Sequence, residues 1–195
     1  MRKTTIMVIA TIISLLVLLT SCSTGIGKKK DPFEDKATEP FTGYKTMADY
    51  DGEEFWVDVT VKEIQELMEK GETFAFIASF ESCPYCNRAL PYVAEAVKEY
   101  GGKIGYLNTR KDPSWSNNLD IDDYDIFAEL FGDYLQLDAV NIPHLYVPDM
   151  FFIKNGKIVA NCDCSVTDGN NATLPLTDEQ EKELRDNLKE CFDKL

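Results

Sequence analysis

The chain lacks the ligands of a structural zinc site. It has a single histidine, His144, and its one Cys-x-x-Cys spacing, at Cys83 and Cys86, is not repeated. Because such sites take four Cys or His ligands, we expect no metal, and nothing in the sequence indicates another cofactor. Basic residues are also scarce. The formal net charge is −14 at pH 7, and a surface of that sign disfavours nucleic acid as a partner.

The sequence also has no hydrophobic run long enough for a permanent transmembrane helix. Its N-terminal apolar stretch, Ile6–Leu19, is interrupted by Thr11 and Ser14 and follows the basic residues Arg2 and Lys3. A short basic start before an apolar stretch of this length is typical of a signal peptide.

This stretch ends in Leu19-Thr-Ser-Cys22, which resembles the lipoprotein signal of bacteria. The resemblance implies that residues 1–21 are a signal peptide and that Cys22 carries the lipid, which anchors the protein to the extracytoplasmic face of the cell membrane. An uncleaved anchor and an ordinary secretory signal are the alternatives. Residues 22–50 have the polar composition of a flexible linker, and residues 51–195 are long enough for one domain.

The segment Ser82-Cys83-Pro84-Tyr85-Cys86 follows the apolar run Phe74–Phe80 and opens an amphipathic, helix-like run that reaches Tyr100. Two thiols at this spacing can close a small disulfide ring. The dipole and free N–H groups of a helix N-terminus stabilise a thiolate on the first of them. We therefore predict that Cys83 is a nucleophile and that Cys86 is its resolving partner.

Hydrophobic periodicity predicts alternating strands and helices along the domain. Thr60 and Thr177 are expected helix N-caps, and Asn155-Gly156 is expected to form a tight hairpin. The predicted strands are 55–59, 74–80, 103–109, 150–153 and 157–161, and the predicted helices are 61–70, the run from the redox turn to 100, 124–137 and the segment after Thr177.

With this βαβαβαββα order, residues 53–195 resemble thioredoxin-fold proteins, and Pro148 to Gly156 match the family's proline, strand and Lys-Asn-Gly turn. The resemblance implies an α/β thioredoxin fold with a central mixed β-sheet flanked by helices. It also implies that Pro148 is a cis-proline facing the thiols, and that Val147, Pro84 and Tyr85 contact the substrate. The Cys-Pro-Tyr-Cys motif is similar to that of glutaredoxins, whereas its context is more similar to the bacteriocin-transport accessory group.

The sequence departs from the thioredoxin pattern at two positions. Where thioredoxins commonly have a buried Asp and a Lys that move protons for the resolving thiol, this chain has Ile77 and Tyr106. Glu81 is the nearest candidate proton acceptor, or else a solvated carboxylate of the turn. Asp149 is expected either to lie near the thiols, where its charge would oppose thiolate formation, or to face solvent.

A second pair of cysteines, Cys162 and Cys164, follows the last predicted strand. That strand returns toward the sheet edge that carries Cys83, so we expect the pair near the first one. The hypothesis is a second redox pair that exchanges with or protects Cys83–Cys86. The alternatives are a structural disulfide, two separate thiols or copper binding. Cys191, about three turns into the last helix, is expected to be a poor partner and a buried thiol.

Together these features predict an extracytoplasmic thiol–disulfide oxidoreductase that acts on protein or peptide substrates and has an electron partner in the membrane. One alternative is a non-catalytic accessory or peptide-binding module of a secretion system. Another is a structural role, in which Cys83 and Cys86 form a permanent disulfide.

Overall fold

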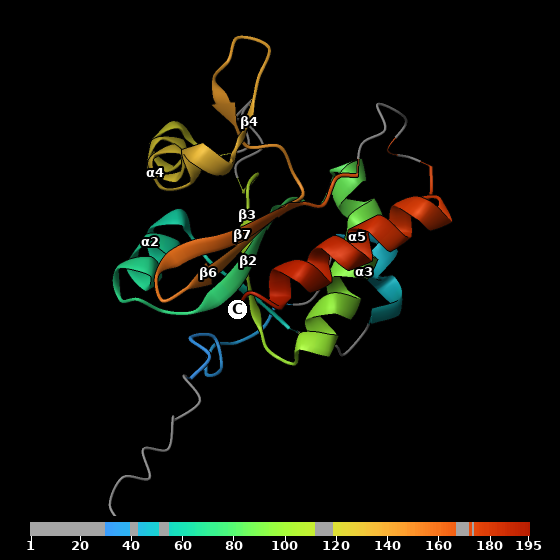
Figure 1. Cartoon of the computed structure of the whole chain (residues 1–195), viewed down its shortest axis with the longest axis horizontal. Coiled ribbons are helices and arrows are strands. Elements are labelled where there is room, and N and C mark those ends of the chain that lie inside the picture. The colour runs from blue at the N-terminus through green and yellow to red at the C-terminus, as the bar shows by residue number, and fades with distance from the viewer. Residues whose placement is uncertain (1–29, 40–42, 51–54, 112–118, 167–171, 173) are drawn as a thin grey trace, which may run out of the picture. The chain divides into compact units, whose positions relative to one another are not determined.

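A computed structural model describes residues 30–39, 43–50, 55–111, 119–166, 172 and 174–195. The chain divides into two units, residues 1–30 and Asp31–Leu195, and the second is described below (Figure 1). The predicted signal peptide, 1–21, and the predicted lipidation site, Cys22, lie outside the described residues. No helix within the described part is both long and apolar enough to cross a membrane.

Five strands of the described chain form one mixed sheet in the order β1-β3-β2-β6-β7. Strand β3 is parallel to both β1 and β2, whereas β6 is antiparallel to β2 and β7 is antiparallel to β6. The strands are β1 (Trp56–Asp58), β2 (Phe74–Ser79), β3 (Ile104–Asn108), β6 (Asp149–Lys154) and β7 (Lys157–Asp163).

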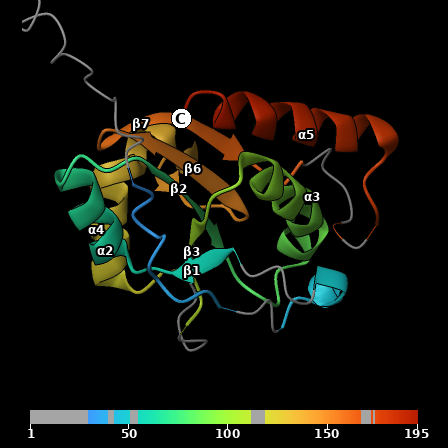
Figure 2. The same ribbon diagram turned by 90° about the horizontal axis from the view of Figure 1, so that it is seen from below.

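Helices cover both faces of this sheet, as Figure 2 shows. One face carries α2 (Val61–Glu69) and α4 (Ile121–Phe131), and the other carries α3 (Pro84–Tyr100) and α5 (Asp178–Phe192). The 3-10 helix η1 (Lys45–Tyr50) packs against α3. Because the central strand β2 is covered on both faces, all of its residues are buried. The α/β thioredoxin fold predicted from the sequence is confirmed.

Local sequence signals account for most of the element ends. Thr60 and Thr177 begin α2 and α5 with complete capping boxes, in which the Thr side chain accepts from a backbone N–H and the Glu63 or Gln180 side chain accepts in return. At Asn155-Gly156 both residues have positive φ, 51° and 74°, as the two-residue hairpin between β6 and β7 requires.

The third predicted helix, 124–137, is wrong at both ends. Helix α4 begins earlier, because the Asp120 side chain accepts from the Asp123 N–H as an N-cap, and it ends at Phe131. A short 3-10 helix, η2 (Gly132–Tyr134), and a hairpin of β4 (Gln136–Leu137) and β5 (Pro143–His144) follow. The Asp138 carboxylate accepts from the N–H groups of Val140 and Ile142, which stabilises the loop of the hairpin whose first strand, β4, replaces the end of the predicted helix.

The packed domain begins earlier than the predicted boundary at residue 51. Phe33 is fully buried and meets Phe74 edge to face at 5.7 Å, and Asp31 accepts hydrogen bonds from the N–H groups of Phe33 and Lys103. Tyr44 and Met47 are also buried. The predicted linker 22–50 is thus corrected for residues 31–39 and 43–47. The composition of this segment predicted a linker because its few buried apolar residues lie among many charged ones.

Candidate redox site

Cys83 is the N-cap residue of α3. Its backbone is extended, with φ −75° and ψ 119°, and its Sγ accepts a hydrogen bond of 3.2 Å from the Cys86 N–H. Pro84 occupies the first turn, where its missing N–H costs no hydrogen bond. Strand β2 ends at Ser79, so the turn places the Cys83 thiol beyond the C-terminal end of this central strand and at the positive end of the helix.

The two thiols differ in acidity. The pKa of Cys83 is lowered from 9.0 to about 7, chiefly by a hydrogen bond from the Cys86 thiol, with help from the N–H groups of Cys86 and Tyr85 and the charge of Arg110. Burial, followed by the interaction with Cys83, raises the pKa of Cys86 far above its ordinary value. Only the first thiol can therefore be a thiolate at neutral pH, which fits the predicted roles of nucleophile and resolving thiol.

Across from Cys83 lies the Val147–Pro148 peptide bond, which is cis as predicted. The Val147 carbonyl accepts a hydrogen bond of 3.6 Å from the Cys83 Sγ. On the helix side, Pro84 is exposed and Tyr85 is partly buried, with the Arg88 guanidinium over its ring at 5.4 Å. The structure therefore brings all the predicted residues of the first redox pair and its surroundings together, and substrate contact by Pro84, Tyr85 and Val147 remains a prediction.

Behind Cys86 lies a buried network of hydroxyl groups that the sequence did not predict. The Ser79 hydroxyl hydrogen-bonds the Cys86 thiol and lies 2.8 Å from the Tyr44 hydroxyl, which lies 2.9 Å from that of Tyr106. Ile77, at the position of the family's Asp, is fully buried. The available signal was Ser79 itself, a polar residue in an otherwise apolar buried strand. Tyr44 lies in the predicted linker, and the sequence predicted no role for it at the redox site.

Burial is the largest cause that raises the pKa of both Tyr44 and Tyr106. Both phenols are therefore neutral at physiological pH and can pass a proton on, but neither is a base that keeps it. The charge of Glu81 contributes to the raised pKa of Tyr106, so this exposed carboxylate of the redox turn lies within electrostatic reach of the network. Glu81 is exposed, in agreement with the alternative prediction that it is a solvated carboxylate of the turn.

Asp149 is buried, so the expectation that it faces solvent is wrong. It is the first residue of β6, and its carboxylate accepts a hydrogen bond of 2.6 Å from the Asn161 side chain. Burial, followed by the charge of Asp163, raises its pKa well above the usual range. Asp149 lies opposite Asp163 in the pairing of β6 with β7, beside the second cysteine pair, and its carboxylate contributes to the raised pKa values of Cys162 and Cys164.

The second pair lies next to the cis-proline, as topology predicted, because the Cys164 N–H donates a 3.1 Å hydrogen bond to the Pro148 carbonyl. The expectation that Cys191 is a poor partner is wrong, since its thiol hydrogen-bonds that of Cys162. Helix α5 packs along β7, and so position along the helix does not measure distance from the strand. Among the described residues, no group of three or more Cys, His, Asp or Glu is arranged to hold a metal ion.

No protein-family model and no curated protein matches the chain. Solved structures similar to it include the thioredoxin of Aeropyrum pernix, with 20% identity and a TM-score of 0.35 over 53% of this chain and 71% of that one. Thioredoxin O1 of Arabidopsis thaliana in its oxidized state has 17% identity and a TM-score of 0.37 over 71% and 98%. The fold assignment therefore rests on this chain's own strand order, cis-proline and Cys-x-x-Cys helix N-terminus.

The lowered pKa of Cys83 predicts the pH dependence of its alkylation. Because only the thiolate reacts, the rate for iodoacetamide should rise with pH and reach half its maximum near pH 7. Cys86→Ala removes the largest cause of the lowering, so its midpoint should move upward toward 9.0. Mass spectrometry of the Cys83 peptide gives both profiles. A wild-type midpoint near 9 would contradict the assignment of Cys83 as the activated thiol.

Proposed function

We propose that the protein is an extracytoplasmic thiol–disulfide oxidoreductase that acts on protein or peptide disulfides. The observation that carries this proposal is the arrangement at Cys83. Its thiol has a lowered pKa at a helix N-terminus, faces the backbone before a cis-proline and has a protonated, buried Cys86 thiol beside it. An activated thiol paired with a protected one is what disulfide exchange requires.

The proposed reaction is two successive displacements. The Cys83 thiolate attacks a substrate disulfide, forming a Cys83–substrate mixed disulfide and releasing the first substrate sulfur as a thiol. Cys86 then loses its proton and attacks the Cys83 sulfur, which forms the Cys83–Cys86 disulfide and releases the second substrate thiol. Two electrons pass from the dithiol to the substrate. The reverse sequence oxidises a substrate dithiol, and an electron partner in the membrane would restore the starting state in either direction.

We place the hydroxyl network in the second step. The Cys86 thiol has a raised pKa and is buried, so it needs a path for its proton when it attacks the mixed disulfide. The Ser79 hydroxyl contacts that thiol and leads through Tyr44 to Tyr106. This path replaces the Asp and Lys of thioredoxins, and Tyr44 belongs to the segment that precedes the conventional fold.

The proton path predicts that Ser79→Ala and Tyr44→Phe slow the resolution of a preformed Cys83 mixed disulfide by about 100-fold, the lower end of the range for general acid–base effects. Stopped-flow measurement of the released chromophoric thiol gives the rate of this step. The pH dependence of that rate should also change in the two variants. Tyr134→Phe is the matched control because that side chain is 44% exposed. Wild-type resolution rates in both variants would exclude the path.

The function itself is tested by equilibrating the full chain with glutathione and dithiothreitol redox buffers and following exchange with a disulfide-bonded peptide. We expect a Cys83–Cys86 midpoint within the span of known disulfide oxidoreductases, about −120 to −270 mV, together with catalysed exchange. A much lower potential without exchange would show that the pair is structural.

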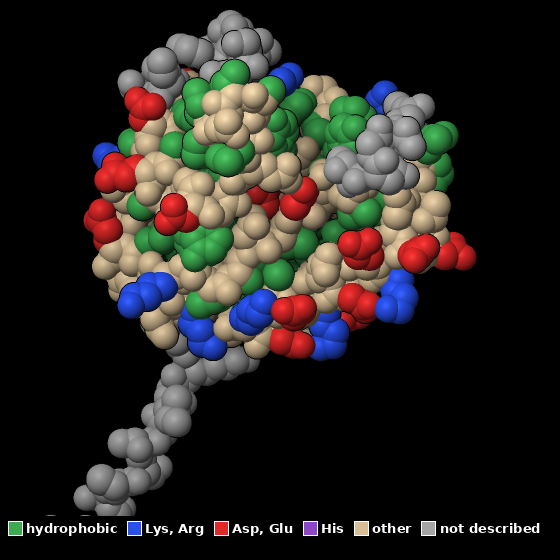
Figure 3. Space-filling view, turned by 45° about the horizontal axis from the view of Figure 1, so that its top comes forward, with side chains coloured by type: hydrophobic (Ala, Val, Ile, Leu, Met, Phe, Trp, Pro, Cys, Tyr) green, Lys and Arg blue, Asp and Glu red, His purple; other side chains and the backbone are tan. Residues whose placement is uncertain are grey.

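A groove beside the redox turn favours a second candidate, a peptide-binding accessory module without turnover. The groove has a volume of about 710 Å³ and is lined by the start of α3, the turn at Glu81 and Ser82, η1 residues and Leu174 to Leu176. Exposed apolar side chains also gather on the β4–β5 hairpin (Figure 3), where Leu137, Val140 and Ile142 are 59%, 70% and 56% exposed. A Cys83→Ala/Cys86→Ala variant that fully replaces the wild type in its cell would favour this candidate.

Lipid attachment through Cys22 is part of the proposal and rests on the sequence alone. Cys22→Ser should abolish labelling of the protein by radioactive palmitate in its bacterial host and leave the precursor uncleaved. Cys191→Ala, which keeps Cys22, is the matched control. Labelling that survives in Cys22→Ser would remove the proposed anchor without affecting the redox chemistry.

A further inference from the structure

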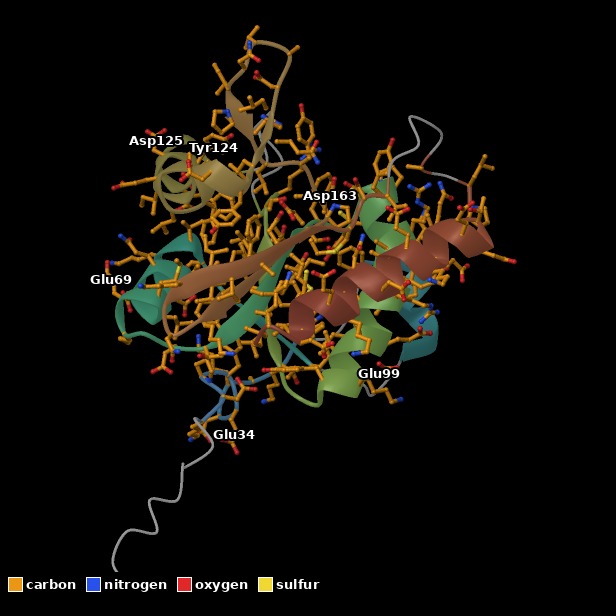
Figure 4. The ribbon with its side chains drawn as sticks, viewed as in Figure 1. Glu34, Glu69, Glu99, Tyr124, Asp125 and Asp163 are labelled. Atoms are coloured by element: carbon orange, nitrogen blue, oxygen red, sulfur yellow. The ribbon has the colours of Figure 1, made fainter. Side chains whose placement is uncertain are left out.

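Three thiols outside the Cys83–Cys86 pair converge between β7 and α5. Cys162 lies on β7, Cys164 directly after it and Cys191 near the end of α5, and all three are buried. Figure 4 labels Asp163, the residue between the first two, at the end of β7. Buried cysteines usually act as small apolar residues, but here the sulfur atoms contact one another.

The thiols form a linear array with Cys162 in the middle. The Cys164 Sγ lies 3.7 Å from the Cys162 Sγ and also donates to the Cys162 carbonyl at 3.3 Å. On the other side, the Cys162 thiol hydrogen-bonds the Cys191 thiol, whose Sγ lies 3.8 Å from the Asn161 carbonyl. Cys162 can therefore reach either neighbour, whereas no contact joins Cys164 directly to Cys191 among the described hydrogen bonds.

This array adjoins the redox site through one dipeptide. The Val147 carbonyl accepts from the Cys83 Sγ, and the Pro148 carbonyl accepts from the Cys164 N–H. The Val147–Pro148 backbone thus contacts both cysteine groups.

We propose that Cys162, Cys164 and Cys191 form a second dithiol–disulfide site, in which Cys162 forms a disulfide with Cys164 when the protein meets a low-molecular-weight disulfide. One thiolate of the pair attacks the reagent, forming a mixed disulfide and releasing one reagent thiol. The other thiol then displaces the second. The site loses two electrons to the reagent, and its two protons end on the released thiols.

The surroundings predict that this site reacts more slowly than Cys83. The hydrogen bond with Cys164, followed by burial and nearby charges, raises the pKa of Cys162. The pKa of Cys164 is also raised, because burial and the carboxylates of Asp149 and Asp163 outweigh its hydrogen bond with Cys162. Since the thiolate is the reactive species, we expect oxidation of the array at least tenfold slower than that of the first pair.

Cys191 provides the alternative partner. It is the most exposed of the three, at 7%, against 4% for Cys162 and 0% for Cys164. When Cys164 is absent, the same Cys162 sulfur is left in contact with the α5 thiol. A disulfide there would join β7 covalently to the last helix.

The test uses the reduced full chain, oxidised glutathione as the reagent and mass-spectrometric mapping of disulfides after alkylation. In the Cys83→Ala/Cys86→Ala variant we expect loss of two thiols from the array and a Cys162–Cys164 linkage. Adding Cys191→Ala should leave that linkage unchanged, whereas adding Cys164→Ala should move it to Cys162–Cys191. Adding Cys162→Ala should prevent any disulfide in the array.

Circular dichroism of each variant shows whether it is folded, and Cys162→Ser is a second variant should Cys162→Ala fail to fold. Three intact thiols after equilibration, a linkage that forms only in denaturant, or a Cys164–Cys191 disulfide without Cys162 would each overturn the proposal. The result is independent of the proposed function, because Cys83–Cys86 exchange is measured on different peptides and is removed from the start.

Discussion

Replacing Cys83 by alanine is expected to reduce disulfide exchange to the uncatalysed rate, whereas replacing Cys86 by alanine should trap the substrate on the protein. The asymmetry follows from the two environments. Cys83 has a pKa of about 7 and supplies the attacking thiolate, while the protonated Cys86 is needed only to resolve the mixed disulfide. Non-reducing gel electrophoresis and mass spectrometry of Cys86→Ala with a disulfide-bonded peptide should show a Cys83–peptide adduct.

Cys191→Ala is the matched control for this pair of variants, because it also removes a buried thiol, but one on α5 that is not among the groups that shift the pKa of Cys83 or Cys86. It should exchange at the wild-type rate. If neither Cys83→Ala nor Cys86→Ala reacts and Cys86→Ala forms no adduct, the two cysteines have a structural role.

The elements that position Cys83 could be predicted because their signals are local. The apolar run of β2, the Thr60 capping box and the Asn155-Gly156 hairpin each depend on a few consecutive residues. The cis-proline, in contrast, could not be predicted from the residues around it. It came from the resemblance to thioredoxins, because only a minority of X-Pro bonds are cis.

The residues that were missed depend on contacts between distant parts of the chain. Tyr44 reaches Ser79 and Tyr106 across the fold, and Cys191 meets Cys162 because α5 lies along β7. Spacing within one helix or strand carries no information on such pairs. The first strand of the hairpin after α4 was missed for a different reason, since Leu137 continues the helical period of α4 although its side chain is 59% exposed.

Composition was the least reliable guide, and the N-terminal segment shows why. The region from Asp31 to Lys36 is mostly charged, yet its charges bind the domain: Asp31 accepts from the Lys103 N–H, and the Lys103 ammonium donates to the carbonyls of Glu34 and Lys36. Phe33 lies among them with 0% of its surface exposed. Its ring also approaches Gly105 so closely that a Cβ there would lie 3.3 Å from the Phe33 Cζ.

We therefore expect Phe33→Ala to lower the free energy of unfolding by about 3–5 kcal/mol, the usual cost of removing a buried phenyl ring and leaving a cavity. The ring packs edge to face on Phe74 of the central strand, so its loss reaches the core of the sheet. Urea unfolding followed by circular dichroism measures the change. The expected loss is a large fraction of the stability of a domain this size.

Val140→Ala is the control, because its side chain is 70% exposed on the hairpin and its removal should change the free energy of unfolding by no more than about 0.5 kcal/mol. A flexible linker residue would behave like this control. If Phe33→Ala also changes stability by less than about 1 kcal/mol, the segment from residue 31 does not belong to the folded core. A large loss would show that the segment that supplies Tyr44 to the redox site is anchored through Phe33.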